Sequence, residues 1–432
     1  MGRDRVSLLQ SRQGNRVLIR RVLGLGTYPI VKPVHGGQRR VAAFKTFYGS
    51  IGIDYVYTCV FNPNHYGADL IGPDDIALTA VSSEEGPVDL IGDVLSGRQA
   101  ATDEVSFRHF LGLVQRLRPD ALQLEHPFMW PLAKRLRDEI GEEQLPLIYS
   151  SHNVEAPLKG DILSGSNVAT EVRERIRDSI EQMEGEVCRA ATLTVCVSAS
   201  EQKHYLTYQP WAERVVVVPN GVDRPPARIS EYPACSREFA QRPFAFMVGS
   251  AYPPNIDGFC RYVLADGAFM VPPRKSIAIC GGACHGIFNH PLFQRFVAAN
   301  SQRCHFFSEI DDPDLWSIKM KCHAVLLPIG TGRGSNLKTA EALVLGKWVI
   351  ATSVAMRGYE AFLDAEGLVI ANDSVSFRRA IAQALHSPLP PIDNKSRQAR
   401  EALYWDRCFT DSSLARMLQA GFSPRGGSIG PT

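Results

Sequence analysis

Short apolar runs rich in β-branched residues alternate with longer segments of helical periodicity along almost the whole chain. Apolar runs of about four to eight residues bounded by polar or glycine-containing segments are typical of buried parallel strands. The alternation therefore predicts an α/β fold, with parallel sheets covered by helices. In the first half, strands are expected at 17–23, 53–60, 76–81, 121–124, 147–151, 193–197 and 215–218, and helices at 37–49, 104–117, 130–139 and 172–189.

The second half repeats this pattern after a proline-punctuated stretch at 223–242 without clear periodicity, which is typical of a linker. Its strands are expected at 244–248, 276–280, 304–307, 324–327 and 348–351, and its helices at 256–264, 291–299, 313–321, 337–345 and 376–384. The predicted organisation is an N-terminal domain at 1–228, a C-terminal domain at 229–393, a helical segment at 394–420 packing back toward the first domain, and a flexible tail at 421–432.

Length and composition agree with two folded domains. A chain of 432 residues exceeds what one hydrophobic core usually organises, and 45% hydrophobic with 21% charged residues is typical of globular proteins. A net charge of +2 argues against a nucleic-acid partner. No apolar run approaches the roughly 18 residues of a spanning helix, and the first residues do not resemble a signal peptide, so we expect a cytoplasmic protein.

Two further patterns concern metals and membranes. The ten cysteines are dispersed and form no C-x2-C pair, which indicates reduced thiols and no metal site. Residues 1–50 hold ten lysines or arginines against the single acid Asp4. This segment is either a contact for an anionic membrane or phosphate, or an ordinary solvated basic face.

The segment at 324–352 has the strongest chemical signal: an apolar strand, a glycine-rich loop, a helix and a second strand. Glycines allow close backbone approach, and the N-terminus of the following helix favours a phosphate. Lys338 adds a positive charge in the first turn, and the Glu341 carboxylate suits the vicinal hydroxyls of a ribose. The alternative is a flexible turn with a solvated lysine and a surface glutamate.

In the first half, candidate residues follow the expected strands. His152 comes directly after one strand, and Glu125 with His126 ends another, so both positions lie where parallel sheets bind ligands. An imidazole there can donate to a sugar hydroxyl or phosphate without a permanent charge. The glycine pair at 36–37 and Arg39 open the first helix, where an anion or an ordinary turn is expected.

Six motifs together resemble, in order, the family 4 glycosyltransferases of the GT-B fold, especially those of bacterial surface and exopolysaccharide synthesis. They are HGGQRR at 35–40, SHNVEA at 151–156, VSASE at 197–201, VVPNGVD at 217–223, FMVGSAYPPNIDG at 246–258 and the block at 324–352. The resemblance implies two doubly wound Rossmann-like domains facing across a cleft. It also implies transfer from a nucleotide-diphosphate sugar with retained anomeric configuration, no metal and no further cofactor.

The resemblance also implies roles for individual residues. The catalytic residues would be His152, Lys338 and Arg333; the donor would contact Glu341, Ser335, Asn336, Gly334, Gly281, Gly282 and Gly249; the acceptor would contact Gly36, Gly37, Arg39, Glu125, His126, Asn153 and Glu155. Arg333 stands where the family usually has a glutamate. An arginine cannot accept hydrogen bonds from sugar hydroxyls, but it can pair with phosphate.

The expected partners are the nucleotide-sugar donor, a glycan or lipid-linked acceptor, and an anionic membrane touched peripherally at the inner face of the plasma membrane. Two alternatives remain, and Arg333 bears on the first of them. One is a catalytically inactive GT-B module that binds or scaffolds, and the other is a GT-B sugar-nucleotide epimerase.

Overall fold

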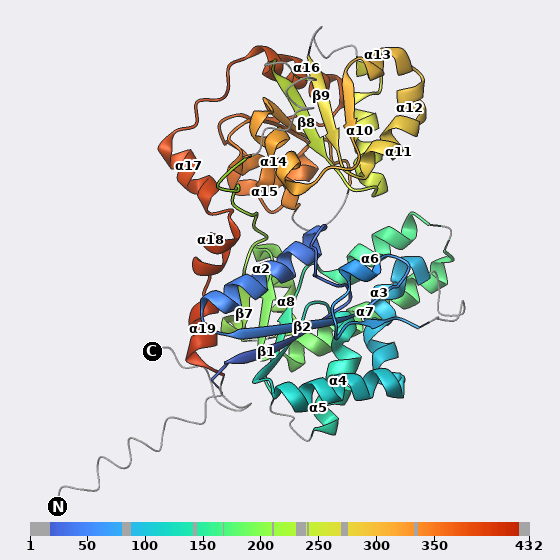
Figure 1. Cartoon of the computed structure of the whole chain (residues 1–432), viewed down its shortest axis with the longest axis vertical. Helices are drawn as coiled ribbons and strands as arrows, with labels where there is room; N and C mark the ends of the chain where they lie inside the picture. The colour runs from blue at the N-terminus through green and yellow to red at the C-terminus, as the bar shows by residue number, and fades with distance from the viewer. Residues whose placement is uncertain are drawn as a thin grey trace, which may run out of the picture. The chain divides into compact units, whose positions relative to one another are not determined.

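The computed structural model describes residues 18–79, 88–140, 145–166, 168–209, 211–229, 239, 242–268, 275–331 and 336–422. The chain forms two compact units, each a parallel sheet flanked by helices (Figure 1). The first unit runs to Pro219 and resumes at Cys408, and the second is Asn220–Arg407. The predicted boundaries are at 229 and 394. The division falls elsewhere because Val222 hydrogen-bonds Leu403 and Trp405 (2.9 and 3.0 Å), which ties both connecting segments to the second unit.

The first unit contains a seven-stranded parallel sheet in the order β3-β2-β1-β4-β5-β6-β7. Its strands are β1 (Arg21–Gly26), β2 (Asp54–Phe61), β3 (Ile76–Ala77), β4 (Ala121–Leu124), β5 (Leu147–Ser150), β6 (Leu193–Cys196) and β7 (Val215–Val217). The order reverses direction between β1 and β4, and such a switch point opens a ligand crevice at the carboxyl ends of the strands.

Helices cover both faces of this sheet. They are α2 (Gly36–Ser50), α3 (Val88–Thr102), α4 (Glu104–Leu117), α5 (Trp130–Glu139), α6 (Glu155–Ser164), α7 (Thr170–Ala190), α8 (Ala199–Tyr205) and, near the C-terminus, α19 (Leu414–Ala420). The core packs Leu23, Leu122 and Leu147 of the strands against Phe110 of α4. Phe409 stacks on Phe47 of α2 with ring centroids 4.5 Å apart, which attaches the C-terminal segment to this unit.

The second unit contains a six-stranded parallel sheet in the order β10-β9-β8-β11-β12-β13. Its strands are β8 (Phe244–Val248), β9 (Ser276–Cys280), β10 (Cys304–Phe307), β11 (Ala324–Leu327), β12 (Trp348–Ala351) and β13 (Leu368–Ile370). Its helices are α10 (Pro253–Val263), α11 (Ala283–Asn289), α12 (Pro291–Gln294), α13 (Val297–Ser301), α14 (Asp312–Lys321), α15 (Leu337–Val344), α16 (Ser374–His386) and α17 (Asn394–Glu401), with α18 (Trp405–Thr410) at the junction of the units.

The two sheets confirm the predicted α/β doubly wound fold, but several elements differ from expectation. The first strand is Arg21–Gly26 rather than 17–23, because it continues through two glycines, Gly24 and Gly26. The side chains of Tyr55 and Tyr57 pack over these glycines, where an added Cβ would collide with them. Helices α3, α6, α8 and α11 were not predicted from the sequence, and the expected segment 394–420 is three helices. The expected strand at 76–81 is only Ile76–Ala77 among the described residues, and positions 423–432 of the expected tail lie outside them.

Within the described residues, no helix has both the length and the apolar character needed to span a bilayer.

Candidate functional site

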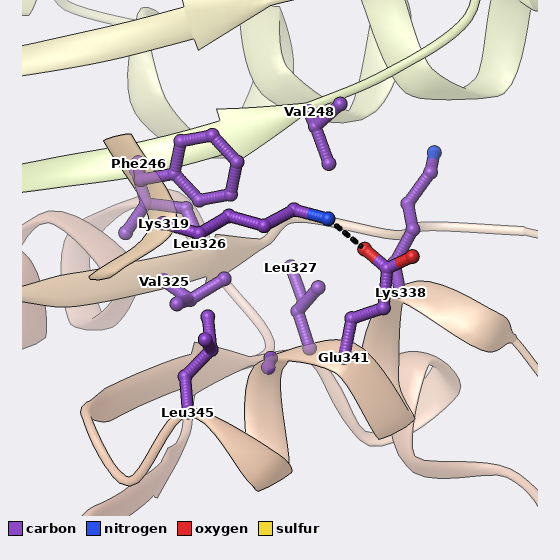
Figure 2. Close-up of a pocket in the computed structure, with 10 residues that line it drawn as sticks. Phe246, Val248, Lys319, Val325, Leu326, Leu327, Lys338, Glu341 and Leu345 are labelled. Atoms are coloured by element: carbon purple, nitrogen blue, oxygen red, sulfur yellow. Dashed lines mark hydrogen bonds and ion pairs between the residues drawn. The ribbon is translucent and has the colours of Figure 1, made fainter. Parts of the chain in front are cut away.

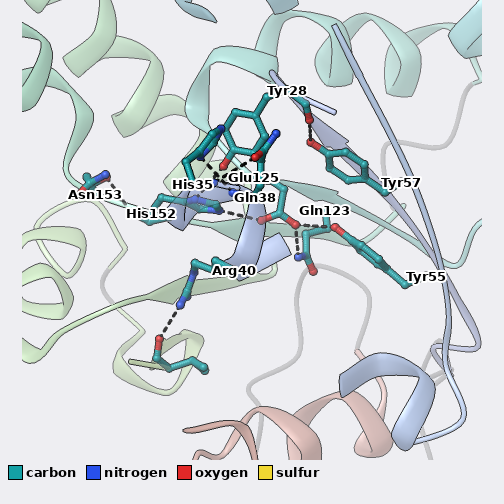
Figure 3. A network of polar contacts seen from close by, with 12 residues as sticks. Tyr28, His35, Gln38, Arg40, Tyr55, Tyr57, Gln123, Glu125, His152 and Asn153 are labelled. Carbon is teal, nitrogen blue, oxygen red and sulfur yellow. Dashed lines mark hydrogen bonds and ion pairs between the residues drawn. The ribbon is translucent and has the colours of Figure 1, made fainter. Parts of the chain in front are cut away.

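A buried chain of polar contacts lies at the carboxyl edge of the first sheet (Figure 3). Tyr28 follows β1, Glu125 follows β4 and His152 follows β5. The Tyr28 hydroxyl is 3.1 Å from Nδ1 of His152, whose Nε2 is 3.1 Å from Oε2 of Glu125. The fold therefore brings together two residues predicted from separate motifs, and it adds a tyrosine that the sequence analysis did not single out.

Glu125 is held by a second set of donors. Its Oε1 accepts hydrogen bonds from the Tyr55 hydroxyl (2.5 Å) and from Nε2 of Gln123 (2.6 Å). Burial raises the pKa of Glu125, and these hydrogen bonds together with the charge of Arg40 oppose that rise. Gly24 on β1 allows the hydrogen bond from Tyr55 to Glu125, because a Cβ at Gly24 would collide with the Tyr55 hydroxyl.

His152 is in its neutral form at pH 7. Burial lowers its pKa well below the ordinary value, and the charges of Arg40 and His35 lower it further. When Glu125 is ionised its oxygens can only accept, so Nε2 of His152 carries the proton and Nδ1 accepts from the Tyr28 hydroxyl. With Glu125 ionised, the imidazole is thus held in one tautomer by partners on both sides.

His126 packs beside this pair and has an unsatisfied atom. Its ring centroid is 4.5 Å from that of His152 and 5.2 Å from that of Tyr28. Nδ1 of His126 is buried without a hydrogen-bond partner among the described residues, and burial lowers the pKa of the ring. An unpaired buried polar atom costs free energy, so this position suits a ligand hydroxyl.

Several residues at the start of α2 make contacts within the protein. His35 caps this helix by accepting from the Gln38 amide, and Gly37 lies against Tyr28, where a Cβ would collide with the phenol. Arg39 is half-buried, next to the exposed Gly36. Arg40, the next residue of this helix, is buried and donates through Nη1 to the Val218 carbonyl (3.0 Å).

The residues after His152 form a buried carboxylate cluster. Asn153 hydrogen-bonds Glu155, and burial raises the pKa of Glu155 to about 8 against the opposing charge of Lys159. The amides of Glu155 and Ala156 donate to the carboxylate of Glu184 on α7 (2.8 and 3.1 Å). Because Glu184 already satisfies these amides, the N-terminus of α6 is not an anion site.

In the second unit, Lys338 and Asn255 meet at the carboxyl edge of the sheet. Nζ of Lys338, in the first turn of α15, donates to Oδ1 of Asn255 in the first turn of α10 (2.6 Å). The amide of Lys338 is capped by Oδ1 of Asn336 (3.1 Å). Burial lowers the pKa of Lys338 to about 8, and Glu341 opposes this shift. The lysine is therefore a desolvated cation held at a helix N-terminus.

Glu341 forms an ion pair that the sequence analysis did not foresee. Its Oε2 is 3.0 Å from Nζ of Lys319 on α14, and both side chains line a small pocket with Lys338 (Figure 2). Lys319 is only 4% exposed. Oε1 of Glu341 keeps no partner among the described residues, so one carboxylate oxygen remains available to a ligand.

Glycine turns complete this edge. Gly281 has φ +85°, and the amide of Ala283 donates to the Gly249 carbonyl at 2.9 Å, which draws the ends of β8 and β9 together around Gly282. The predicted residues Arg333, Gly334 and Ser335 lie outside the described residues. In the part of the chain that is described, no group of three His, Cys, Asp or Glu side chains is placed to hold a metal ion.

Residues 94–224 match the family model described as Glycosyltransferase Family 4. No curated protein matches the sequence significantly. Among solved structures, sucrose-phosphate synthase (tll1590) from Thermosynechococcus elongatus is 14% identical with a TM-score of 0.63, covering 91% of this chain and 97% of that one. Anabaena Alr3699/HepE, solved with UDP and glucose, is 14% identical (TM-score 0.53; 93% and 97% covered). An α,α-trehalose-phosphate synthase (UDP-forming) from Burkholderia vietnamiensis is 13% identical (TM-score 0.55; 93% and 98% covered).

The structural likenesses confirm the predicted GT-B fold, and the match over residues 94–224 agrees with the predicted resemblance to the family 4 glycosyltransferases.

Proposed function

We propose that the chain, of which residues 94–224 match the Glycosyltransferase Family 4 model, moves a sugar from a nucleotide-diphosphate sugar to a glycan or lipid-linked glycan in polysaccharide biosynthesis. The observation that carries this proposal is the arrangement of Lys338, Asn255 and Glu341 at the carboxyl edge of the second sheet. It offers a cation and a helix N-terminus to a diphosphate and an unpaired carboxylate oxygen to a ribose.

The first unit supplies the acceptor site in this proposal. Nδ1 of His126 has no partner in the described chain, and the neighbouring His152 is held in one tautomer by Glu125 and Tyr28. Neutral imidazoles can position sugar hydroxyls as either donors or acceptors. Asn153 and Glu155 follow in the same loop and helix.

We propose that transfer retains the anomeric configuration and uses neither a metal nor a further cofactor. The acceptor hydroxyl forms the new glycosidic bond on the face from which the diphosphate leaves, and its proton passes to the departing phosphate oxygen. Lys338 stabilises the negative charge that develops on that phosphate. The proposal assigns no carboxylate as a nucleophile.

One experiment separates the three candidate functions. The protein is incubated with UDP-, GDP-, ADP- and TDP-sugars, with and without a glycan acceptor, and the released nucleotide and sugar products are identified. A transferase releases nucleotide faster when acceptor is present. An epimerase converts donor alone, and an inactive module binds nucleotide without turnover. Either of the last two results would overturn the proposed transfer.

Replacing Glu341 by glutamine is expected to weaken nucleoside diphosphate binding about 10- to 150-fold, because the hydrogen bond to the ribose loses its charge, a loss of roughly 1.5 to 3 kcal/mol. Titration calorimetry with the best-binding nucleotide measures this. The matched control is Glu360→Gln, an exposed glutamate of the same unit. Equal affinity of the folded Glu341→Gln variant and the wild type would remove Glu341 from the ribose site.

We further propose that the basic N-terminal segment holds the enzyme against the inner face of an anionic membrane. Several cations of this segment are already engaged within the described residues. Arg21 pairs with Asp54 (2.7 Å) and Lys32 pairs with Asp69 (2.8 Å), which offsets their charge, and Arg40 is buried. Arg20 is exposed, and Arg3, Arg5, Arg12 and Arg16 lie outside the described residues.

Substituting Arg12, Arg16 and Arg20 by serine is expected to reduce co-sedimentation with phosphatidylglycerol vesicles at low salt, since each cation near an anionic surface is worth about 1 kcal/mol. Wild-type binding should fade as salt screens the charges. A charge-matched control replaces the exposed Lys321, Arg379 and Lys395 of the second unit. Equal sedimentation of the variant, the control and the wild type would show that the segment is a solvated face.

A further inference from the structure

A second pocket lies at the opposite edge of the second sheet, where β8, β9 and β10 begin. It has a volume of about 190 Å³. Its polar lining is mostly basic: Arg242, Lys275, Arg303, Ser276, Gln302 and His305. This edge holds the amino ends of the strands, whereas Lys338 and Glu341 lie beyond their carboxyl ends.

The sheet topology brings three cations to the same edge of the sheet. Arg242 stands just before β8, Lys275 directly before β9 and Arg303 directly before β10. These strands are neighbours in the order β10-β9-β8, with Phe244 opposite Ser276 and Ile277 opposite Cys304. A basic residue therefore precedes each strand, and by this register the three positions follow one another one residue apart along the strand direction.

No protein group neutralises this cluster within the described chain. None of the three side chains makes an ion pair or a hydrogen bond with a described residue, and the pocket lining contains no acid. Nε of Arg303 is buried and has no hydrogen-bond partner among the described residues. Burial and the neighbouring Arg242 both lower the pKa of Lys275, as expected for cations that repel one another.

The rest of the lining limits what the pocket can hold. Phe239 stacks on Phe244 with centroids 4.1 Å apart and forms an apolar wall. Ser276 hydrogen-bonds Nε2 of His305 (3.1 Å) and adds a neutral polar group. A volume of about 190 Å³ is below the roughly 300 Å³ at which pockets accommodate drug-sized ligands, so a compact group fits better than an entire nucleotide.

We propose that this pocket is a second anion site, separate from the donor site, that binds a compact, multiply charged phosphate group between Arg242, Lys275 and Arg303. Guanidinium groups match phosphate oxygens with paired hydrogen bonds, and lysine adds a point charge. Such a ligand supplies the negative charge that the described protein does not. The proposal goes beyond the sugar transfer and does not depend on it.

The test is titration of the full chain with inorganic tripolyphosphate at low salt. Arg303→Gln and Lys275→Gln are each expected to weaken binding about 10-fold, as for the loss of one charge-assisted contact. The matched control Arg379→Gln replaces an exposed arginine on α16 and is expected to leave the affinity unchanged. Equal binding by all four proteins, or no binding by the wild type, would overturn the proposal.

Two further arms separate this site from the donor site and free phosphate from lipid. The Lys338→Met variant is expected to retain tripolyphosphate binding. If this variant no longer bound tripolyphosphate, the anion would belong to the donor site and the proposal would be contradicted. Phosphatidylglycerol vesicles replace tripolyphosphate in the last arm. If Arg303→Gln binds tripolyphosphate more weakly than Arg379→Gln but the two variants bind the vesicles equally, the ligand is a small phosphorylated molecule. If Arg303→Gln also binds the vesicles more weakly, the ligand is a lipid headgroup. Both results support the pocket as a phosphate site.

Discussion

Replacing His152 by alanine is expected to lower the rate of sugar transfer about 100- to 10,000-fold, the range for a positioned acid, base or hydrogen-bonding group. The imidazole is buried, neutral and hydrogen-bonded at both nitrogens to Tyr28 and Glu125, so its removal leaves both groups without this partner at the proposed acceptor site. Nucleotide affinity is expected to stay nearly unchanged, because Lys338 and Glu341 belong to the other unit. Steady-state kinetics with saturating donor, together with nucleotide titration, measure both quantities.

The control for this variant is His386→Ala, which removes an exposed histidine on α16. Losing His152 also leaves Glu125 with one partner fewer, so thermal unfolding must show that the variant is folded under the assay conditions. If nucleotide affinity fell while transfer by the saturated enzyme did not, the assignment of His152 to the acceptor site would be wrong.

Replacing Lys338 by methionine is expected to lower turnover about 100- to 1,000-fold, comparable to removing one preorganised donor from a developing negative charge. Binding of the nucleoside alone should change little, because the lysine faces the diphosphate in the proposed mechanism. The exposed Lys321, at the end of α14, provides the matched control Lys321→Met. Equal turnover of Lys338→Met and wild type would remove this lysine from the mechanism.

The pH dependence of the wild type gives the same hypothesis a second readout. Burial lowers the pKa of Lys338 from its ordinary value of 10.5 to about 8. The free enzyme therefore loses this cation as pH rises through 8, and kcat/KM should decline above that pH. Bound diphosphate favours the charged form, so nucleotide binding near pH 8 should take up protons. The Lys338→Arg variant should lose the decline because arginine stays protonated. A flat wild-type profile up to pH 10 would contradict this reasoning.

The sequence alone predicts the architecture well because that information is local. Alternating apolar runs and helical periods identify most strands, and the glycine-rich block at 324–352 marks a phosphate-binding helix start. Lys338 and Glu341 are one turn apart on that helix, so their shared face is determined by helix geometry alone. Helices such as α6 escaped prediction because Glu155, Ala156 and Lys159 are buried together and leave no clear polar face.

Which polar residues distant in sequence contact one another is determined only by the tertiary structure. The sequence suggested His152 and Glu125 separately, but their hydrogen bond, and the role of Tyr28, depend on β1, β4 and β5 lying next to one another. In the same way, Lys319 reaches Glu341 and Asn255 reaches Lys338 only after α14, α10 and α15 pack on the second sheet. Periodicity identifies which face of a helix or strand is buried. Strand order and helix packing determine which polar groups meet at the edge of the sheet, because parallel strands bring the ends of separate chain segments to that edge.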